Sequence, residues 1–592
     1  MTVRHTRSRT SGDASPFILL WRAFVVQFFT NESATSDIYL RERAVWVLAF
    51  LLVPGVFILV LLLPEVSFVM IRARFGRGPA SSVDDLLEWV AFVLTTYAMA
   101  GTGFITVLAW DALTFDRRDA MVLGPLPLRR PTMIGAKLAA LGTLLAAGSI
   151  PINGLNAVVF ASETADQLGG AVLVKHFAAI LVATIGASLF IFAAIVMIRS
   201  TAALLGGPRL TSMLGPPLQF FFIAGLLCLV ILCPAVSSTR FVTNTSANWM
   251  PSAWFMGVFE QLRGSPRTFN MDVPVLTLAR RAWFATPIAI AGAVILSVLE
   301  FRRHTSLASA PSASAGLLGG ARLGRTLTRV LVGRNAVART VADFILLTIA
   351  RNPARQVPIA INAAIGAAIV IAALSRDARD LASLMQPRTA VLWIPLVLGY
   401  WIAIGVRASF LVPSELPASW VFRVNTPNAA RAYWSAVRAS MLALVVPSTL
   451  LITVVLMIPL LGWGVAMWHA LFACAVATLL VQVLALTMCH IPFTRPYQAG
   501  NAKLNTRWWM YLVGLWAFAY WPIRLELQVL GDPVALLELV GAIATAIAVL
   551  EAVGRRRALN RSVEAIEEAE DVRSEFTVLG LAGWIENAQT GP

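Results

Sequence analysis

The chain has 592 residues, of which 58% are hydrophobic and only 13% are charged, and its mean hydropathy is +0.75. Soluble domains carry about 25% charged residues, so this composition excludes an ordinary soluble protein and indicates a chain that lipid solvates. The formal net charge of +16 comes from basic residues distributed among many short segments. A nucleic-acid-binding protein instead gathers them on one surface, so we expect membrane lipid as a partner and no nucleic acid.

The chain begins with a polar, basic segment, which an amphipathic stretch over residues 17–29 follows. Arg22 lies in the middle of this stretch, and no small-residue cleavage site follows it. The pattern therefore predicts a helix that lies at the membrane interface and no secretory signal. We expect residues 1–43 to form a cytoplasmic N-terminal segment that contains this interfacial helix.

Apolar runs that are long enough to cross a bilayer as helices recur about twelve times along the chain. Helices are favoured because a lone strand would leave its backbone polar groups unpaired in lipid. We predict an all-α integral membrane protein with about twelve transmembrane helices in two pseudo-repeated six-helix units. The predicted spans cover residues 44–64, 89–110, 138–161, 177–197, 216–235, 283–300, 358–374, 390–406, 441–461, 464–489, 508–524 and 534–553.

The two groups of six spans are separated by residues 305–328, which are rich in Ser, Ala and Gly. This composition predicts a flexible segment that packs poorly. We expect a first membrane unit over residues 44–301, a cytoplasmic linker with a second interfacial helix over 302–356, a second unit over 357–553, and an acidic cytoplasmic tail over 554–592.

The distribution of basic residues predicts the orientation. If the N-terminus is cytoplasmic and the spans alternate, the segments on the inner side carry most of the 47 Lys and Arg residues. This bias follows the positive-inside rule. We therefore expect a multi-pass protein of the cell (inner) membrane with both termini in the cytoplasm.

Few ionisable residues lie deep within the predicted spans. Glu88, Asp111, Glu300 and Glu551 lie at span ends, and Glu538 lies about one turn inside the last span. The histidines His176, His469 and His490 lie near span ends too, which favours hydrogen-bonded or solvated side chains over a proton relay. The sequence contains no phosphate loop, no dinucleotide fingerprint and no protease or hydrolase motif. We expect a protein that is not an enzyme and has no metal site.

One arrangement occurs in both halves. An amphipathic stretch (residues 17–20 in the first half and 344–347 in the second) precedes two spans, and a charged, proline-containing loop follows them. Prolines stiffen such a loop, and a stiff charged loop could pass the motion of a cytosolic partner to the spans; a topogenic loop without a partner is the alternative. The candidate coupling residues are Asp119, Pro127, Arg129, Arg130 and Lys137 in the first loop, and Glu415, Pro427, Arg431 and Arg438 in the second.

The first of these loops, DAMVLGPLPLRRPTMIGAK from Asp119 to Lys137, resembles the inner loop of ABC exporter permeases. In that family an acidic residue precedes a Leu-Pro-Leu or Leu-Pro-Val step, and a helix resumes through a lysine. The second loop departs from the pattern, because Glu415 replaces the acid, Pro427 ends an Asn-Thr-Pro step, and Arg438 stands where the first copy has Lys137.

The resemblance implies the membrane (permease) subunit of an ATP-driven exporter, with two six-span units fused in one chain. Its partners would be nucleotide-binding ATPase subunits on separate polypeptides. ATP would then bind to the partner, and this chain would hold no cofactor. The apolar bundle suggests a lipidic or amphipathic substrate.

Two other classes stay open. A twelve-span secondary transporter also divides six plus six, and Asp116-Arg117 matches part of the major facilitator loop, although Ala112 and Asp119 stand where that family has glycines. A non-transporting membrane scaffold or enzyme is the third reading. An enzyme would need clustered acids or histidines near an interface, and the sequence suggests no such set.

Overall fold

The computed structural model describes the chain in twelve stretches, residues 15–29, 81–113, 126–165, 170–232, 249–264, 274–307, 319–377, 389–412, 430–488, 492–493, 504–529 and 531–560. Within these ranges all regular secondary structure is helical and no strand is present. The helical fold follows from the composition, since a helix pairs its own backbone groups and can expose apolar side chains to lipid. The prediction of an all-α chain is thus confirmed for the described residues.

Among the described residues, nine helical stretches are long and apolar enough to cross a membrane. They support a multi-pass membrane protein, and each coincides with one or two of the predicted spans. The predicted first span, residues 44–64, lies outside the described residues. The nine stretches are Leu86–Leu108, Arg130–Thr164, Gly170–Gly206, Met213–Ile231, Val275–Arg303, Pro353–Ser375, Thr389–Phe410, Arg431–Leu486 and Pro533–Ala558.

The longest of these stretches is two helices in sequence. Helix α16 (Ala430–Leu486) contains Gly462 with φ 77° and ψ 170°, which is outside helical geometry. Glycine adopts a positive φ without the steric penalty of a side chain, so it permits the break there. Its two parts correspond to the predicted spans 441–461 and 464–489.

The predicted span over residues 508–524 falls on three consecutive helical pieces. These are α17 (Leu504–Leu515), the π-helical turn η5 (Trp516–Tyr520) and α18 (Trp521–Val529). The three pieces are contiguous, so residues 504–529 form one helical run with a π-helical turn inside it, and this run is not among the nine stretches above. The count of twelve spans therefore stays a prediction.

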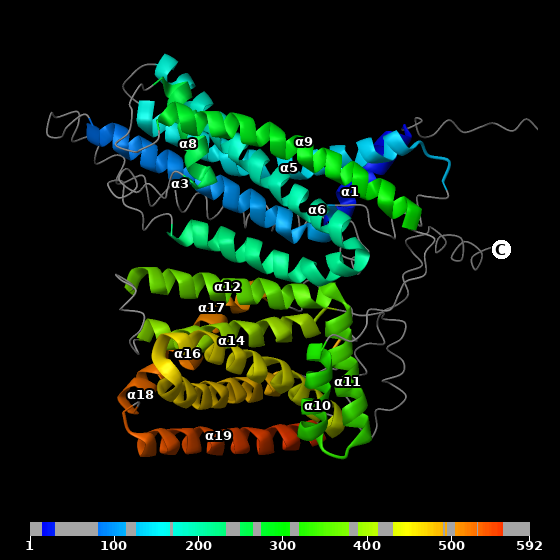
Figure 1. Ribbon diagram of the computed structural model, residues 1–592, viewed down its shortest axis with the longest axis vertical. Coiled ribbons are helices and arrows are strands. Elements are labelled where there is room, and N and C mark those ends of the chain that lie inside the picture. Colours follow the sequence, from blue (N-terminus) through cyan, green and yellow to red (C-terminus); the bar gives the residue numbers. More distant parts are fainter. Residues whose placement is uncertain are drawn as a thin grey trace, which may run out of the picture. The chain divides into compact units, whose positions relative to one another are not determined.

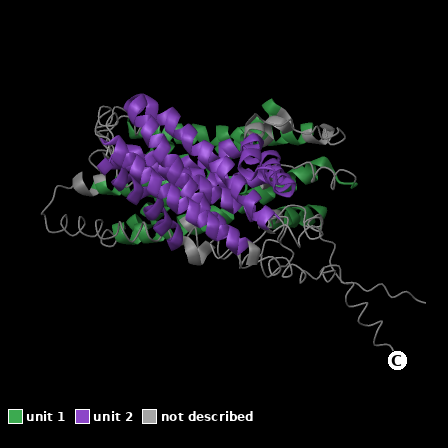
Figure 2. Cartoon of the chain, turned by 90° about the horizontal axis from the view of Figure 1, so that it is seen from below, with its two compact units in different colours: residues 1–32, 37–214, 225–313 green, residues 33–36, 215–224, 314–592 purple. Residues whose placement is uncertain are grey.

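The chain divides into two compact units (Figure 2). The first comprises residues 1–32, 37–214 and 225–313, and the second comprises 33–36, 215–224 and 314–592. Each is described here by itself.

In the first unit, α1, α3, α5, α8 and α9 pack on one another through three buried apolar clusters. Helix α5 contacts α1 and α3, and α8 contacts α3 and α9. A buried apolar cluster joins α3, α5, α6 and α8, and includes the edge-to-face pair Phe160–Phe259 with ring centroids 5.6 Å apart. The helices are α1 (Pro16–Phe29), α3 (Ser81–Leu108), η1 (Trp110–Leu113), α5 (Arg130–Ala165), α6 (Gly170–Leu232, of which residues 215–224 belong to the second unit), α8 (Pro251–Arg263) and α9 (Val275–Leu307).

In the second unit, α12, α14, α16 and α19 pack in sequence, α12 on α14, α14 on α16 and α16 on α19. Helices α10 and α11 contact one another and α16, and they run across the direction of α12, α14 and α19 (Figure 1). One large apolar cluster fills this unit. The helices not yet located are α10 (Gly319–Val332), α11 (Ala336–Arg351), α12 (Pro353–Asp377), α14 (Thr389–Phe410) and α19 (Pro533–Asn560).

Helix α10 corrects one sequence-based prediction. Residues 305–328 were predicted to form a flexible segment that packs poorly, but residues from Gly319 onward are helical and pack on α11 and α16. The reason is amphipathicity. Gly324 and Thr328 are buried and Leu327 and Val332 are partly buried, so one side of the helix packs at helical spacing, and this periodicity outweighs the composition.

Candidate functional site

The predicted coupling segment of the first unit lies at the start of α5. Pro127, Arg129 and Arg130 are not buried, and the two arginines are fully on the surface. Leu128 N donates to Leu126 O at 2.7 Å, which closes a three-residue turn around Pro127. The carbonyl of Arg129 then accepts from Thr132 N and Met133 N at 3.0 and 3.3 Å and begins the helix. The segment is therefore tightly turned and directly continuous with α5.

Pro131 stiffens the first turn of α5 at no cost in hydrogen bonding. The first N–H groups of a helix have no intrahelical partner, so proline there loses nothing. Any displacement of Arg129 and Arg130 would consequently be carried into α5 and not absorbed by a loose loop.

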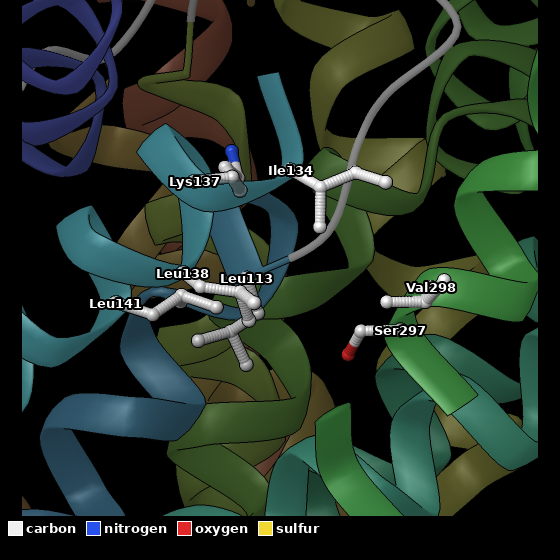
Figure 3. Close-up of a pocket in the computed structure, with 7 residues that line it drawn as sticks. All are labelled: Leu113, Ile134, Lys137, Leu138, Leu141, Ser297 and Val298. Atoms are coloured by element: carbon white, nitrogen blue, oxygen red, sulfur yellow. The ribbon is translucent and has the colours of Figure 1, made fainter. Parts of the chain in front are cut away.

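Lys137 lies two turns further along α5 and is buried, with 2% of its surface exposed. Its ammonium nitrogen lies 4.6 Å from the ring centroid of Phe24 in α1, an attractive cation–π distance. In Figure 3 this nitrogen points away from Ser297 and Val298 of α9. The small pocket between α5 and α9 is lined by Leu113, Ile134, Lys137, Leu138, Leu141, Ser297 and Val298.

Helix α1, which was predicted to be interfacial, is held to α5 by a hydrogen bond as well as by apolar contact. The indole Nε1 of Trp21 donates to Thr143 Oγ1 at 3.0 Å, and Thr143 in turn donates to Ala139 O at 2.9 Å. Leu20 and Phe24 are buried in a cluster with residues of α5 and with Phe301 of α9. In the first unit, the predicted interfacial helix, the coupling segment and the last span thus share one packed core.

The second unit places its equivalents differently. Arg431 is exposed at the start of α16, and Arg438 follows seven residues later, as Lys137 follows Arg130. The guanidinium of Arg438 is buried, pairs with Glu551 Oε2 of α19 at 2.9 Å and lies 5.5 Å from the Trp434 ring centroid. Arg438 therefore connects the coupling helix of the second unit to its last span.

The predicted coupling residues therefore divide into three groups. Pro127, Arg129, Arg130 and Arg431 lie on the surface, where a partner could contact them. Lys137 and Arg438 are buried inside their units, so their charge acts within the chain. The remaining three, Asp119, Glu415 and Pro427, lie outside the described residues.

The last span of each half carries a parallel that sequence reasoning missed. The tripeptide Val-Leu-Glu occurs as residues 298–300 in α9 and 549–551 in α19. Glu300 lies 3.9 Å from Arg199 of α6, and both are almost fully buried, whereas Glu551 pairs with Arg438. Each half thus joins the acid of its last span to an arginine of another helix.

A second polar cluster lies at the opposite end of the first unit. Arg263 of α8 pairs with Glu260 at 2.8 Å and with Asp84 of α3 at 3.1 Å. Burial raises the pKa of the Glu260 carboxyl, and the Arg263 guanidinium opposes that rise. His176 is close enough to Arg263 in space to interact with it electrostatically, and its Nδ1 lies 3.0 Å from Thr164 Oγ1, which joins α6 to α5. The cluster holds the ends of four helices together.

The second unit contains a fully enclosed imidazole–carboxylate pair. His469 Nδ1 lies 2.8 and 2.9 Å from the two carboxylate oxygens of Glu526, and both side chains are 0% exposed. The other ring nitrogen, Nε2, is buried and has no hydrogen-bond partner. The expectation of a hydrogen-bonded histidine is confirmed for His176 and His469, but the burial of an acid beside His469 was not expected.

Sequence reasoning missed both clusters for the same reason. Glu260 and Arg263 were assigned to an outer loop, and Glu526 lies two residues beyond a predicted span. A usable signal existed in the first case, because Trp254, Phe255, Val258 and Phe259 are spaced as on one side of a helix. Such a helix packs its polar end into the bundle instead of leaving it in solvent.

No family model, no curated protein and no solved structure matches this chain.

Proposed function

We propose that this chain is the transmembrane permease subunit of an ATP-driven exporter of the ABC type, with its ATPase on a separate polypeptide. The observation that carries the proposal is the surface position of Arg129 and Arg130, on a tightly turned segment that continues directly into α5. Arg431 has the corresponding place at the start of α16. The sequence has no phosphate loop of its own, so energy from ATP must reach it through a partner.

The internal contacts supply a route from these arginines to the spans. In the first unit, motion of Arg130 moves α5 and, through the Trp21–Thr143 hydrogen bond, also α1. In the second unit, motion of Arg431 moves α16 and, through the Arg438–Glu551 ion pair, also α19. Buried ion pairs and hydrogen bonds at fixed geometry transmit displacement because they have few alternative arrangements.

The composition of the described spans favours a lipidic or amphipathic substrate. Most of the buried side chains in both units are apolar, and several of the charged ones pair with one another, as Arg199 and Glu300 do. A hydrophilic substrate needs fixed charges or hydrogen-bonding groups along its path. An orientation with both termini in the cytoplasm belongs to the proposal, and a topology reporter at residues 162–170 should then be external.

The first test is purification of the full chain from its native membranes in mild detergent. We expect a polypeptide with a GxxxxGK[ST] phosphate loop to purify with it in stoichiometric amounts. The triple variant Arg129→Glu, Arg130→Glu, Arg431→Glu should insert normally and lose that polypeptide. The matched control Arg329→Glu, Arg334→Glu, Arg339→Glu reverses three arginines outside the coupling segments and should retain it. If the wild-type chain is recovered without a polypeptide that carries this phosphate loop, the proposal is refuted.

The His469–Glu526 pair favours one second candidate, a proton-linked secondary transporter. Ionisable pairs enclosed in a membrane bundle often carry protons in such proteins, and the sequence suggested none at this position. Substrate movement in vesicles that depends on a proton gradient and is indifferent to ATP would support this candidate over the first. Under the second candidate Glu526→Gln abolishes gradient-driven transport, whereas under the first it leaves ATP-driven export largely intact.

A further inference from the structure

The α10–α11 hairpin has a well-defined tip. Gly333 closes α10 with φ 71°, and its N–H donates to Arg329 O at 3.2 Å. Asn335 caps α11, since its side-chain oxygen accepts from Ala338 N at 3.1 Å. We define the hairpin tip as the six residues Arg329, Val330, Leu331, Arg334, Val337 and Arg339.

The tip exposes apolar side chains that the unit does not bury. Val330, Val337 and Leu331 are 76%, 43% and 40% exposed. The opposite side of the same hairpin is well packed, because Ala338, Val341 and Ile345 lie in the core cluster. The hairpin runs across the direction of α12, α14 and α19 (Figure 1). Its exposed apolar side chains therefore do not belong to a helix long and apolar enough to span a membrane.

The tip is also strongly basic. Arg329 lies 3.7 Å from Asp343, and the Nε of Arg339 donates to Gly333 O. Arg334 is exposed, and no described residue pairs with it. The same end of the hairpin thus carries three guanidinium groups and three exposed apolar side chains, with Asp343 paired to Arg329. The first interfacial helix, α1, has a different chemistry, because it exposes Phe17, Ile18 and Leu19 with Arg22 as its basic residue.

We propose that the hairpin tip binds anionic phospholipid of the cytoplasmic leaflet. Val330, Leu331 and Val337 enter between the acyl chains, and the three arginines contact headgroup phosphates. Guanidinium groups suit this contact because they donate in a planar fork that matches phosphate oxygens. Charge complementarity identifies an anionic bilayer as the binding partner, because each basic residue near a membrane is attracted to anionic lipid. The proposal does not depend on whether the chain transports by ATP.

The test uses the full chain in mixed micelles of neutral detergent with phosphatidylglycerol or phosphatidylcholine, and measures retained lipid by native mass spectrometry. We expect phosphatidylglycerol to bind in preference to phosphatidylcholine. The variant Arg329→Gln, Arg334→Gln should bind phosphatidylglycerol about tenfold or more weakly, because each arginine strengthens binding to an anionic surface by about fivefold. Val330→Ser, Val337→Ser should weaken both the anionic and the neutral lipid. Each variant should unfold at the wild-type temperature in detergent alone.

The matched control is Arg129→Gln, Arg130→Gln, which removes the same charge from the exposed start of α5. It should keep the phosphatidylglycerol preference. An equal loss of phosphatidylglycerol binding in the control would mean that net charge alone determines binding, and would overturn the proposal. Displacement of the lipid by inorganic phosphate alone would show an anion site without a membrane contact, and this result too would contradict it.

Discussion

The ion pair between Arg438 of α16 and Glu551 of α19 joins these two helices of the second unit. Their side chains meet at 2.9 Å, with the arginine 9% and the glutamate 24% exposed, and Glu551 also accepts from Arg555. The acid that pairs with Arg438 must come from a helix that packs on α16, and α19 is such a helix. The pair is the second unit's counterpart of the contacts between Lys137 and α1 in the first.

The costs of removing the two partners of this ion pair should not add. Arg438→Gln or Glu551→Gln leaves the remaining charge partly enclosed, and we expect each to lower the free energy of unfolding by about 1–3 kcal/mol, after discounting for the exposure of Glu551. The double variant should be less destabilised than the two single losses added together. Thermal unfolding of the detergent-purified chain gives all three values, and strictly additive losses would show that the two groups do not interact.

The Trp21–Thr143 hydrogen bond should contribute to the docking of α1. Trp21→Phe keeps the apolar ring but removes the donor, and Thr143→Val removes the acceptor with little change of shape. We expect each to cost about 1 kcal/mol, and the double variant to cost little more than either one. Limited proteolysis near residue 30 reports the release of α1. If Trp21→Phe leaves that cleavage rate unchanged, the bond has no part in docking.

The close approach of α12 and α14 depends on Gly405. A Cβ added there would lie 2.8 Å from Ile359 Cα and 3.1 Å from Pro358 O, which are backbone atoms that cannot turn aside. Gly405→Ala should therefore destabilise the second unit by about 1–3 kcal/mol. Gly541 is helical with open space around its Cα, so Gly541→Ala is the matched control and should be neutral or stabilising by about 0.5–1 kcal/mol. The same loss in both would point to a general intolerance of alanine.

Glu526 should tolerate an isosteric amide better than an apolar side chain. Glu526→Gln still accepts a hydrogen bond from His469, whereas Glu526→Leu leaves both imidazole nitrogens enclosed without partners. We expect the leucine variant to lose about 1–3 kcal/mol more than the glutamine variant. The unfolding temperatures of the glutamine and leucine variants, measured in the same detergent, test this difference in stability. A leucine variant as stable as wild type would show that the pair is not held for stability, and would strengthen the proton-linked candidate.

Hydropathy predicted the spans well because lipid imposes one simple requirement, a long apolar helix. The runs at residues 390–406 and 534–553 each fall within a helix of the structure, and the run at 89–110 extends two residues past the end of α3 at Leu108. The break inside α16 was also predicted, as the boundary between residues 461 and 464, because Pro459 and Gly462 interrupt the apolar run there.

The polar contacts were not predictable in the same way, since they depend on which helices become neighbours. Nothing in the sequence pairs Arg438 with Glu551, which are over a hundred positions apart. Lys137 was expected to face a cytosolic partner, but α1 covers it. This burial depends on the packing of α1 against α5, which the sequence does not show. Helix α10 was missed for a local reason, because its glycines suggested flexibility and its arginines concealed the apolar periodicity.

The most direct test of the central claim is the rate of ATP hydrolysis by the complex that purifies with this chain, reconstituted in vesicles of anionic lipid. The permease account predicts that hydrolysis purifies with the wild-type chain. It also predicts that the rate falls to background in the variant Arg129→Glu, Arg130→Glu, Arg431→Glu, and that it persists in Arg329→Glu, Arg334→Glu, Arg339→Glu. A wild-type preparation that hydrolyses no ATP, or a rate that the first variant leaves unchanged, would contradict the account.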